Sequence, residues 1–326
     1  MNLAFETCLF RYVEKQMQKE NKVFFVALWQ NDNAIIIGRN QNPLAECDLN
    51  AVEKYGINIA RRITGGGAVY HDKGNLNFSF ILPKEYHNPQ HTSQVLANAI
   101  RAMGLNAELS GRNDLTIDGR KFSGNAYFSS KFAGLHHGTV LIKTSFKRLG
   151  EVLTPDKLKM KNAQVASVKS SVVNLTELLP DITRQEICES IIDSFSSYVK
   201  SLVGEATEVA QFDNDLIVAD EIERQHKLHS SKKWVYGESL GEPTLKGYFT
   251  WGSLSIYFFR SGTKVDTCEF VTDCISLRIW EHLKEILSGC EFTRESLIGK
   301  IEPLLLTSNE SETTILSDVI NLLNKL

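Results

Sequence analysis

Residues 61–80 read RRITGGGAVYHDKGNLNFSF, a stretch that joins two arginines, three consecutive glycines and a His71-Asp72 pair. Glycine has no side chain and adopts positive φ angles without penalty, so the backbone N–H groups of residues 65–67 can approach a ligand closely. N–H groups beside guanidinium charge suit a phosphate or a carboxylate. A flexible hinge with two solvated arginines explains the glycines alone, but it explains the whole combination poorly. We therefore expect an anion-binding loop.

This loop has neither of the common nucleotide-binding patterns. No Gly-Lys-Ser/Thr follows the glycines at the spacing of a P-loop, and the G-x-G-x-x-G spacing of a dinucleotide fingerprint is absent. The anion must therefore be bound in another structural setting.

The segments around the loop predict β-strands. Residues 57–62 bring the arginines to the end of a strand, and residues 75–82 alternate well enough to be its partner. We therefore expect the glycine loop to join two adjacent strands. Earlier in the chain, residues 23–29 form a near-continuous apolar run that is typical of a buried strand. A turn at residues 31–33 follows, and residues 34–37 return as a second strand.

Helices are predicted around these strands. Apolar residues recur at helical spacing from residue 3, Gly56 and Gly104 are C-terminal stop signals, and Thr183 with Glu186 forms a capping box. We expect helices over residues 3–18, 49–55, 89–103, 184–202 and 214–227.

A second dense segment, residues 111–126, reads GRNDLTIDGRKFSGNA. Asp118-Gly119 is a strong hairpin-turn signal, so Asp114 and Lys121 should lie on paired strands. A lysine in this position is most often solvated, and only its neighbours favour a functional role. His136-His137 opens the next strand, where adjacent side chains point to opposite faces and so do not share a metal ion.

The last part of the chain predicts a separate small domain. Residues 234–243 are rich in turn formers, so we place the domain boundary after Pro243, between domains of residues 1–243 and 244–326. The second domain is expected to be α+β and shows no obvious chemistry. Its predicted elements are strands over residues 252–258 and 264–271 and helices over residues 275–287 and 318–326.

Bulk composition excludes several classes of protein. The chain has 326 residues, a net charge of −3 and a pI of about 6.3, which argues against a dedicated nucleic-acid binder. No apolar run approaches the length of a membrane span, and the N-terminus is amphipathic rather than a signal peptide. Six cysteines occur without a C-x-x-C motif, so neither a zinc site nor a redox pair is indicated. We expect a cytoplasmic protein that binds neither nucleic acid nor membrane.

The two dense segments together resemble the lipoate–protein ligase family. The matching residues are Arg61-Arg62-x-x-Gly-Gly-Gly-x-Val-x-His-Asp-x-Gly-Asn, Asn113-Asp114-Leu115 and Gly119-Arg120-Lys121-Phe122-Ser123-Gly124, with shorter matches at Asn2–Glu6, Gly38–Asn42 and Trp234–Gly237. The resemblance implies an α+β fold with a biotin/lipoyl protein ligase-like catalytic domain. That domain would have a central mixed β-sheet flanked by helices, followed by a small α+β C-terminal domain.

The resemblance also implies an activity. Such a ligase uses ATP and Mg²⁺ to activate lipoate or octanoate to acyl-AMP. It then transfers the acyl group to a lysine of an apo lipoyl-domain protein, either a glycine cleavage H-type protein or an E2 subunit of a 2-oxoacid dehydrogenase. Attack of a carboxylate on the α-phosphate of ATP brings two anions together, and cations must offset their repulsion. Arg62 with the glycine-loop amides would do so from one side, and Lys121 from the other.

Site residues follow from the same resemblance. Lys121 is the expected catalytic residue, and Asp114 the expected Mg²⁺ contact, because Mg²⁺ prefers few carboxylates plus phosphate oxygens. The residues expected at ATP or the adenylate are Arg62, Gly65, Gly66, Gly67, Ala68, Val69, Tyr70, Asn113, Asp114 and Lys121. The residues expected at lipoate are Glu6, Trp29, Arg62, Thr64, Val69, His71, Lys121 and His137.

Several alternatives stay open. A lipoyl or octanoyl transferase of the same fold would form a cysteine thioester, and Cys47 is the only cysteine near the presumed pocket sequence. A non-catalytic lipoyl-group binding protein would need the pocket but not Lys121. Trp29 has a plainer role as core, and His71-Asp72 as a local hydrogen-bonded pair. Residues 167–172 read SVKSSV where the family commonly has Ser-Val-Arg-Ser-Arg-Val, which leaves acceptor preference open.

Overall fold

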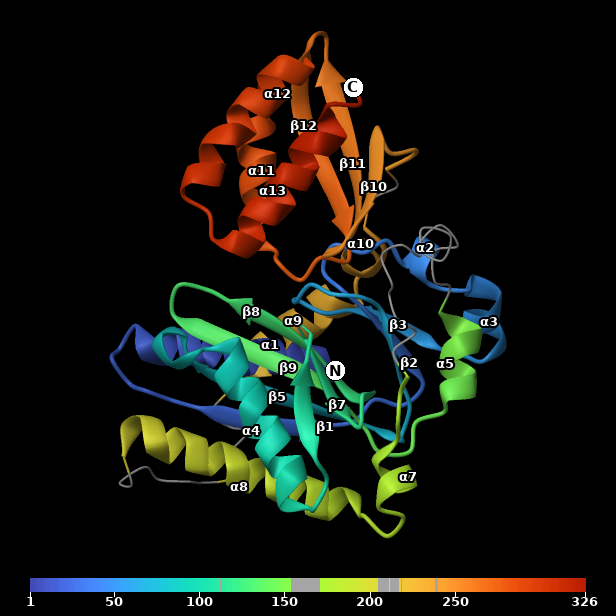
Figure 1. The fold of residues 1–326 in the computed structure, drawn as a ribbon, viewed down its shortest axis with the longest axis vertical. Coiled ribbons are helices and arrows are strands. Elements are labelled where there is room, and N and C mark those ends of the chain that lie inside the picture. Colours follow the sequence, from blue (N-terminus) through green and yellow to red (C-terminus); the bar gives the residue numbers. More distant parts are fainter. Residues whose placement is uncertain (112, 154–170, 205–210, 212–216, 218, 238–239) are drawn as a thin grey trace.

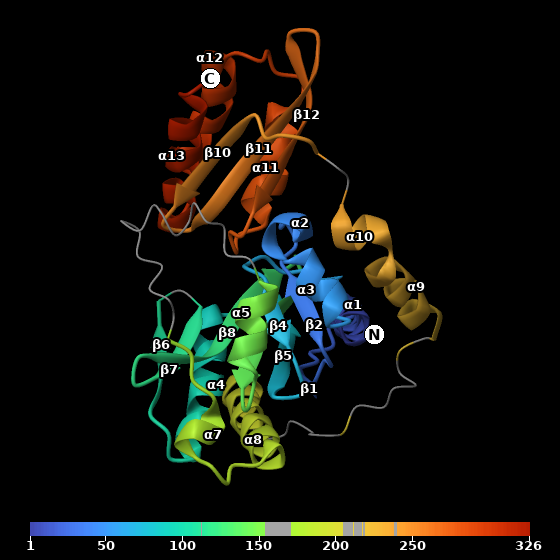
Figure 2. The same cartoon turned by 90° about the vertical axis from the view of Figure 1, so that its right-hand side faces the viewer.

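The structure is a computed structural model that describes residues 1–326 except residues 112, 154–170, 205–210, 212–216, 218 and 238–239. The described residues form a larger unit that carries the N-terminus and a smaller C-terminal unit that stands on one end of it (Figure 1). The view turned by 90° shows the same division (Figure 2).

A six-stranded sheet is the centre of the larger unit. Every neighbouring pair in it is antiparallel, in the order β1, β5, β9, β8, β7, β6. The strands are β1 (Phe25–Trp29), β5 (Asn75–Pro83), β6 (Ala107–Ser110), β7 (Asp114–Ile117), β8 (Arg120–Ser129) and β9 (Ala133–Leu141).

The central strand β5 is buried at every position because helices cover both faces of the sheet. Leu76, Phe78, Phe80 and Leu82 pack with α4 (Pro89–Ala102) and α8 (Arg184–Val203) in the largest apolar cluster. Ile81 faces the other way, toward α1 (Asn2–Met17). The even positions of β5 are thus apolar, whereas the opposite face includes the buried polar residues Asn75, Asn77 and Ser79.

A second sheet of three strands holds the glycine loop. In this sheet β2 (Ala34–Ile37) lies between β3 (Asn58–Arg61), to which it is parallel, and β4 (Val69–His71), to which it is antiparallel. Its outer side is covered by α3 (Leu49–Lys54) and α5 (Phe146–Val152), while α2 (Pro43–Glu46) contacts α10 (Lys232–Tyr236). The loop of residues 62–68 therefore connects two strands of one sheet that do not touch each other.

Two strand pairings predicted above are wrong. Residues 57–62 do not pair with residues 75–82, which form β5 of the large sheet, and β2 does not return against β1. The reason is β4, a three-residue strand that is too short to show alternation in the sequence. It pairs with β2 and completes the small sheet, which leaves β5 to pair with β1 and β9.

The remaining helices of the larger unit are short apart from α9. They are α7 (Leu175–Leu178), α9 (Ala219–Ser230), α10 (Lys232–Tyr236) and the 3-10 turn η1 (Lys84–Tyr86). The helix predicted over residues 214–227 agrees with α9 from residue 219 onward, while residues 214–216 and 218 lie outside the described residues. α9 packs on α1, where His229 Nε2 lies 3.1 Å from Thr7 Oγ1.

The C-terminal unit is a three-stranded antiparallel sheet with helices on one face (Figures 1 and 2). Its elements are β10 (Leu245–Phe249), β11 (Gly252–Ser261), β12 (Lys264–Thr272), α11 (Arg278–Leu287), α12 (Arg294–Ile301), η3 (Glu302–Leu306) and α13 (Glu310–Leu323). The predicted hairpin and the helix around Trp280 are confirmed. β10 and α12 were not predicted, and α13 begins at Glu310 rather than at residue 318.

The α+β class with a small α+β C-terminal domain is confirmed. The central sheet is antiparallel, and the mixed pairing lies in the smaller sheet that carries the glycine loop. The boundary after Pro243 stays a prediction. In the described part of the chain, no helix combines the length and the apolar character needed to cross a membrane.

Candidate functional site

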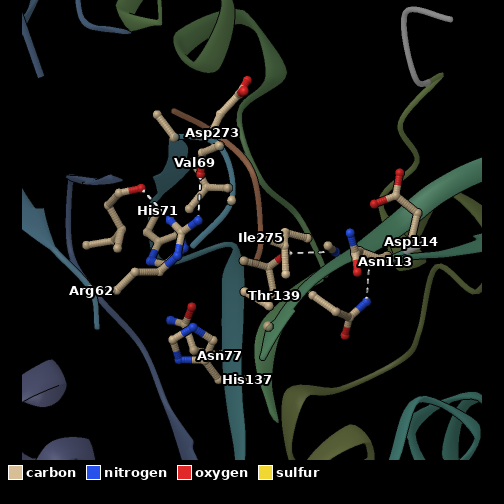
Figure 3. A pocket seen from close by; sticks show the side chains of 18 of the residues that line it. Arg62, Val69, His71, Asn77, Asn113, Asp114, His137, Thr139, Asp273 and Ile275 are labelled. Carbon is tan, nitrogen blue, oxygen red and sulfur yellow. Dashed lines mark hydrogen bonds between the residues drawn. The ribbon is translucent and has the colours of Figure 1, made fainter. Parts of the chain in front are cut away.

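A cavity of about 330 Å³ lies where the two sheets of the larger unit meet the C-terminal domain (Figure 3). Eleven of the residues expected at the substrates line it: Trp29, Arg62, Gly66, Gly67, Ala68, Val69, His71, Asn113, Asp114, Lys121 and His137. They come from five strands or strand ends and from the glycine loop. The tertiary structure thus brings both dense sequence segments to one place.

The cavity runs across the large sheet. Its lining includes residues of β1, β5, β9, β8 and β7, which are consecutive neighbours, so the slot spans four strand spacings, roughly 19 Å. The β1 end is apolar, because Leu3, Ile36, Trp29 and Val69 form one cluster there. The β7 end is polar and carries Asn113, Asp114 and Lys121. Figure 3 shows Val69 and His71 on one side and Asn113 with Asp114 on the other.

Lys121 and Asp114 form an ion pair at the polar end. Lys121 Nζ lies 2.7 Å from Asp114 Oδ1, and the two side chains are 28% and 35% exposed. Between them, Asp118 and Gly119 both have positive φ angles, 50° and 72°, as a tight two-residue hairpin turn requires. The Lys121 N–H also donates to the carbonyl of Ser171 at 2.7 Å. Lys121 therefore projects from a strand that is hydrogen-bonded on both sides.

Arg62 is buried and shapes the glycine loop. Its guanidinium donates to the carbonyls of Ile36, Gly65 and Gly67 and to Thr64 Oγ1 at 2.7 to 3.2 Å. Burial lowers the pKa of Arg62 to about 10, with the nearby Glu6 carboxylate acting in the opposite direction. Arg62 stays charged at neutral pH, but these contacts use four of the five N–H donors of its guanidinium. Its effect on a bound anion is therefore mainly electrostatic.

Arg61 has a structural role and does not line the cavity. Its guanidinium donates to the carbonyls of Gly38, Arg39, Gln41, Trp234 and Val235. Trp234 Nε1 donates back to the Arg61 carbonyl at 2.9 Å. The first arginine of the pair thus joins α10 to the small sheet. Of the two arginines, only Arg62 lines the cavity.

A buried polar network lies beneath the middle of the slot. His137 Nδ1 is 2.9 Å from Glu6 Oε1, and His137 Nε2 is 2.8 Å from Thr64 Oγ1, which also accepts from Arg62. Ser79 donates to Glu6 and accepts from Trp29 Nε1 at 3.1 Å. Glu6 is only 2% exposed. The network connects Trp29, His137 and Arg62, so three residues of the cavity wall are held in one hydrogen-bonded arrangement.

His71 is a neutral side chain in the wall of the cavity. Burial, followed by the charges of Arg62 and His137, lowers the pKa of His71 to about 3. Its neighbour Asp72 accepts from the N–H groups of Gly74 and Ser145, at 2.8 and 2.9 Å, so it fixes the loop through backbone groups. The two residues of the pair thus have separate contacts.

Four expected site residues do not line the cavity. Glu6, Thr64 and Gly65 lie behind its wall, where the first two belong to the polar network. Tyr70 faces the opposite side of the small sheet: it packs in the cluster of α3 and α5, and its hydroxyl donates to Asn33 at 3.1 Å. Alternation along β4 explains this, because Val69 and His71 point into the cavity and Tyr70 between them points away.

The C-terminal domain contributes to the cavity, which the sequence did not indicate. Trp251, Asp273 and Ile275 are part of the lining. The Thr272 N–H donates to the Asn40 carbonyl at 2.9 Å, and the Gly66 N–H to the Cys274 carbonyl at 3.4 Å. The expectation of a domain without chemistry is therefore corrected. No sequence motif around Asp273 or Ile275 indicates a site, because only the docking of the two units brings these residues to the glycine loop.

Further lining residues come from the large sheet and were also not predicted. They are Asn77 on β5, Gly124, Asn125 and Ala126 on β8, and Gly138 and Thr139 on β9. Asn77 lies on the polar face of β5, and the spacing of Asn75, Asn77 and Ser79 could have suggested that this buried face has a function.

No cysteine lines the cavity, as far as the chain is described. Cys47 is buried between the small sheet and its helices, at 4% exposure, and burial, with a smaller effect of Glu46, raises its pKa to about 11. A thiol in this environment is a poor nucleophile, because the thiolate is the reactive form.

The described residues contain no group of three or more His, Cys, Asp or Glu that could hold a metal ion. Asp114 is thus a single carboxylate at the polar end, beside the amide of Asn113 in the sequence. This donor set fits Mg²⁺ that arrives with phosphate oxygens, and it does not form an all-protein cage. Of the altered segment SVKSSV, residues 167–170 lie outside the described residues.

Comparison with known proteins identifies both parts of the chain. Residues 1–196 match the family model of the lipoyl protein ligase A/B catalytic domain, and residues 242–323 match that of the bacterial lipoate protein ligase C-terminus. A lipoate-protein ligase A from Bdellovibrio bacteriovorus is 35% identical over 331 residues, which cover 98% of this chain and 95% of that protein.

Solved structures agree with this result. The chain is similar to Plasmodium falciparum LipL1 in complex with lipoate, with a TM-score of 0.82 and 28% identity over 98% of this chain and 94% of that one. It is also similar to a bipartite lipoate protein ligase from Thermoplasma acidophilum solved with its E2 lipoyl domain, with a TM-score of 0.60 and 28% identity over 74% and 92%. A lipoate-protein ligase A bound with ATP has a TM-score of 0.59 and 27% identity over 72% and 92%.

The sequence matches span nearly the whole chain, and one cavity brings together the two segments that first suggested this assignment. The protein is a ligase that belongs to the lipoate–protein ligase family.

Proposed function

We propose that this protein activates lipoate or octanoate with ATP to an acyl-adenylate and then transfers the acyl group to a lysine of an apo lipoyl domain. The observation that carries this proposal is the shape of the slot. One end is an apolar cluster around Trp29, and the other holds the Lys121–Asp114 pair, with the glycine loop in the same cavity wall. A fatty acid such as lipoate or octanoate is likewise apolar along its chain and charged at its single carboxylate end.

In the first step, a carboxylate oxygen of the acid attacks the α-phosphorus of ATP. A P–O bond forms, the bond to the pyrophosphate leaving group breaks, and acyl-AMP and pyrophosphate result. Lys121 would stabilise the charge that develops on the α-phosphoryl oxygens, since a fixed cation near the reacting phosphorus lowers the barrier. Gly67 is open on its cavity side, which supports close approach of a phosphate to the loop backbone.

Asp114 changes partners in this scheme. In the described structure its Oδ1 lies 2.7 Å from Lys121 Nζ, so the pair is neutral overall. Mg²⁺ held by Asp114 and phosphate oxygens would supply positive charge to the triphosphate. Lys121 would then lose its carboxylate partner and be available to the acid and the α-phosphate. The ion pair thus keeps the lysine ordered before the substrates bind.

In the second step, the neutral amine of an acceptor lysine attacks the acyl carbon. A C–N bond forms, AMP leaves with the electron pair of the broken C–O bond, and the amine loses a proton. The acceptor would be a glycine cleavage H-type protein or an E2 subunit of a 2-oxoacid dehydrogenase. The archaeal relative solved with its E2 lipoyl domain supports an acceptor of this kind.

The transferase alternative has less support. It requires a reactive cysteine at the acyl carbon, whereas Cys47 is buried outside the cavity and its pKa is about 11. The ATP-bound relative also favours adenylation.

The test is incubation with ATP, Mg²⁺, lipoate and an apo lipoyl domain, followed by intact mass and pyrophosphate release. We expect the acceptor to gain one lipoyl group with one pyrophosphate released. Acyl transfer without pyrophosphate from a preformed acyl donor would indicate the transferase. Lipoate binding with neither product would indicate a binding protein.

A further inference from the structure

A chain of hydrogen bonds runs from the start of α1 to His71 in the cavity wall. Asn2 Nδ2 donates to the backbone carbonyl of Gln30 at 2.7 Å and to Asn31 Oδ1 at 3.1 Å. Because a carbonyl only accepts, this end of the Asn2 amide must be its nitrogen, and Asn31 Oδ1 must accept. Asn31 Nδ2 then faces His71 Nδ1 at 3.1 Å.

This chain determines where the proton of His71 lies. An amide nitrogen carries only donors, so His71 Nδ1 accepts, and the neutral ring has its proton on Nε2. The ring is 3% exposed and lines the cavity. Its Nε2 atom is buried and has no hydrogen-bond partner among the residues that the structure describes. A buried N–H donor without a partner is costly, and the ring that carries it belongs to the cavity wall.

The position of His71 indicates which part of a ligand it meets. His71 pairs with Ala34 on the small sheet and lies two residues from Val69, at the apolar end of the slot. Lys121 and Asp114 are at the opposite end. Arg62 is a cation whose charge acts on His71, and four of its five donors are directed at backbone carbonyls and Thr64. His71 therefore offers a neutral N–H donor beside the apolar cluster of Trp29 and Val69, which suits a weak, uncharged acceptor.

We propose that Asn31 is a positioning residue that fixes His71 as an Nε2–H donor, and that this donor contacts a sulfur of the lipoyl dithiolane. The proposal rests on the function proposed above. Sulfur is a weak acceptor, but octanoate offers only C–H groups at this end and would leave the donor unpaired in a desolvated site. The arrangement therefore favours lipoate over octanoate.

The first experiment reads the tautomer directly. The ¹⁵N shifts of His71 in the free protein at neutral pH are expected to show a protonated Nε2 and a bare Nδ1. Asn31→Asp places a group that only accepts beside Nδ1, so Nδ1 should become protonated. Asp32→Asn is the control, since its exposed side chain changes charge in the same turn. A wild-type ring protonated on Nδ1, or averaged between tautomers, overturns the proposal, as does an unchanged Asn31→Asp spectrum.

The second experiment reads selectivity as the ratio of kcat/KM for lipoate over octanoate in pyrophosphate release. His71→Phe keeps a ring without the donor and should lower this ratio about five- to tenfold. His71→Gln should restore most of it, because its amide nitrogen lies near the place of Nε2. Equal ratios for wild type and His71→Phe overturn the sulfur contact. Absence of pyrophosphate with either acid, beside the expected ¹⁵N pattern, would instead reject the proposed function.

Discussion

At the scale of single residues, neighbours of the same type have different roles. Arg61 binds five backbone carbonyls and joins α10 to the small sheet, whereas Arg62 shapes the glycine loop from below. His136 lies in the apolar core beside Phe78, whereas His137 lines the cavity and contacts Glu6. The pleat of β9 explains why the two histidines have different surroundings, because adjacent residues of a strand face opposite sides of the sheet.

Lys121 is the residue whose replacement should be most damaging. We expect Lys121→Ala to lower the rate of acyl-adenylate formation about a hundred- to a thousandfold, because a positioned cation contributes most in the transition state. Lys121→Arg should recover only part of the rate, since a forked guanidinium does not replace a point charge. Pyrophosphate release under single-turnover conditions measures both effects.

The control for Lys121 is the preceding residue. Arg120 does not line the cavity, so Arg120→Ala should keep near-normal turnover. Lys121→Ala should also fold normally, because a partly exposed ion pair contributes only about 0 to 1 kcal/mol. Equal loss of activity at both positions would mean that the catalytic cation has been assigned to the wrong residue.

Buried histidines should make the protein sensitive to acid. Burial lowers the pKa of His71 to about 3, that of His87 to about 4, and that of His136 well below its usual value. The unfolded chain therefore takes up protons first as the pH falls below about 6.5, and each such histidine then removes up to about 1.4 kcal/mol per pH unit. Stability should be highest above pH 6.5 and fall toward pH 4.

Urea unfolding between pH 7.5 and 5 measures this slope before most carboxylates titrate. His136→Gln is the informative variant, because it removes one titrating ring and keeps a group able to bond Asn125. It should be less stable than wild type at pH 7.5 but show a shallower loss on acidification. A slope identical to wild type would show that His136 does not remain neutral in the folded state.

At the scale of elements, the glycine loop consists of three positions with different requirements. A Cβ at Gly65 would lie 2.6 Å from the carbonyl oxygens of Cys274 and Ile275 in the C-terminal domain. Gly66 has a φ of 92°, and a Cβ there would lie 2.9 Å from the guanidinium of Arg62. A Cβ at Gly67 would meet nothing within 4 Å. Gly65 thus allows the C-terminal domain to dock, Gly66 allows the left-handed backbone conformation, and Gly67 leaves open space beside the loop.

These differences predict separate effects of three alanine variants. Gly67→Ala should leave the melting temperature within a degree or two of wild type, since nothing in the protein is displaced, yet weaken acyl-adenylate binding at least tenfold. Gly66→Ala should lose both stability and binding, because a left-handed φ is unfavourable for alanine. Gly65→Ala should mainly weaken docking of the C-terminal domain. Calorimetry for unfolding and for ligand binding, made on all three, distinguishes the patterns.

The loop would be misassigned if Gly67→Ala bound the acyl-adenylate as tightly as wild type. That result would mean that no ligand atom approaches the loop on its open side.

At the scale of the whole molecule, the C-terminal domain closes the site. It has its own apolar core around Trp280, and it contacts the glycine loop through the segment after β12. The Gly66 N–H, which is one of the donors expected to face a phosphate, points at the Cys274 carbonyl at 3.4 Å. A ligand that takes this N–H would have to displace that carbonyl, so ligand binding and domain position should be coupled.

We therefore predict that the C-terminal domain moves relative to the catalytic unit when the acyl-adenylate forms. The turn-rich residues 236–243 connect the two units, and few chain segments cross between them. Small-angle scattering should differ between the free and the acyl-adenylate-bound protein, and the rate of proteolysis within residues 236–243 should change. Identical profiles together with identical cleavage would count against the prediction.

The sequence by itself determined the local features of this protein. The hairpin at Asp118-Gly119, the capping box at Thr183 and Glu186 and the helix around Trp280 are confirmed, because each depends on interactions within a few residues. The composition of the two dense segments also sufficed to indicate the family. Eleven of the site residues that the resemblance to this family implies line one cavity.

Only the tertiary structure decided which of these parts touch. Strand pairing between β4 and β2, the outward direction of Tyr70 and the entry of Asp273 and Ile275 into the cavity all depend on contacts between distant segments. The separation of Arg61 from Arg62 has the same origin, because their acceptors come from three segments of the chain, residues 36–41, 64–67 and 234–235. Contacts of this kind depend on which apolar faces can be buried together. That depends on the packing of the whole molecule, so no single segment of the sequence determines it.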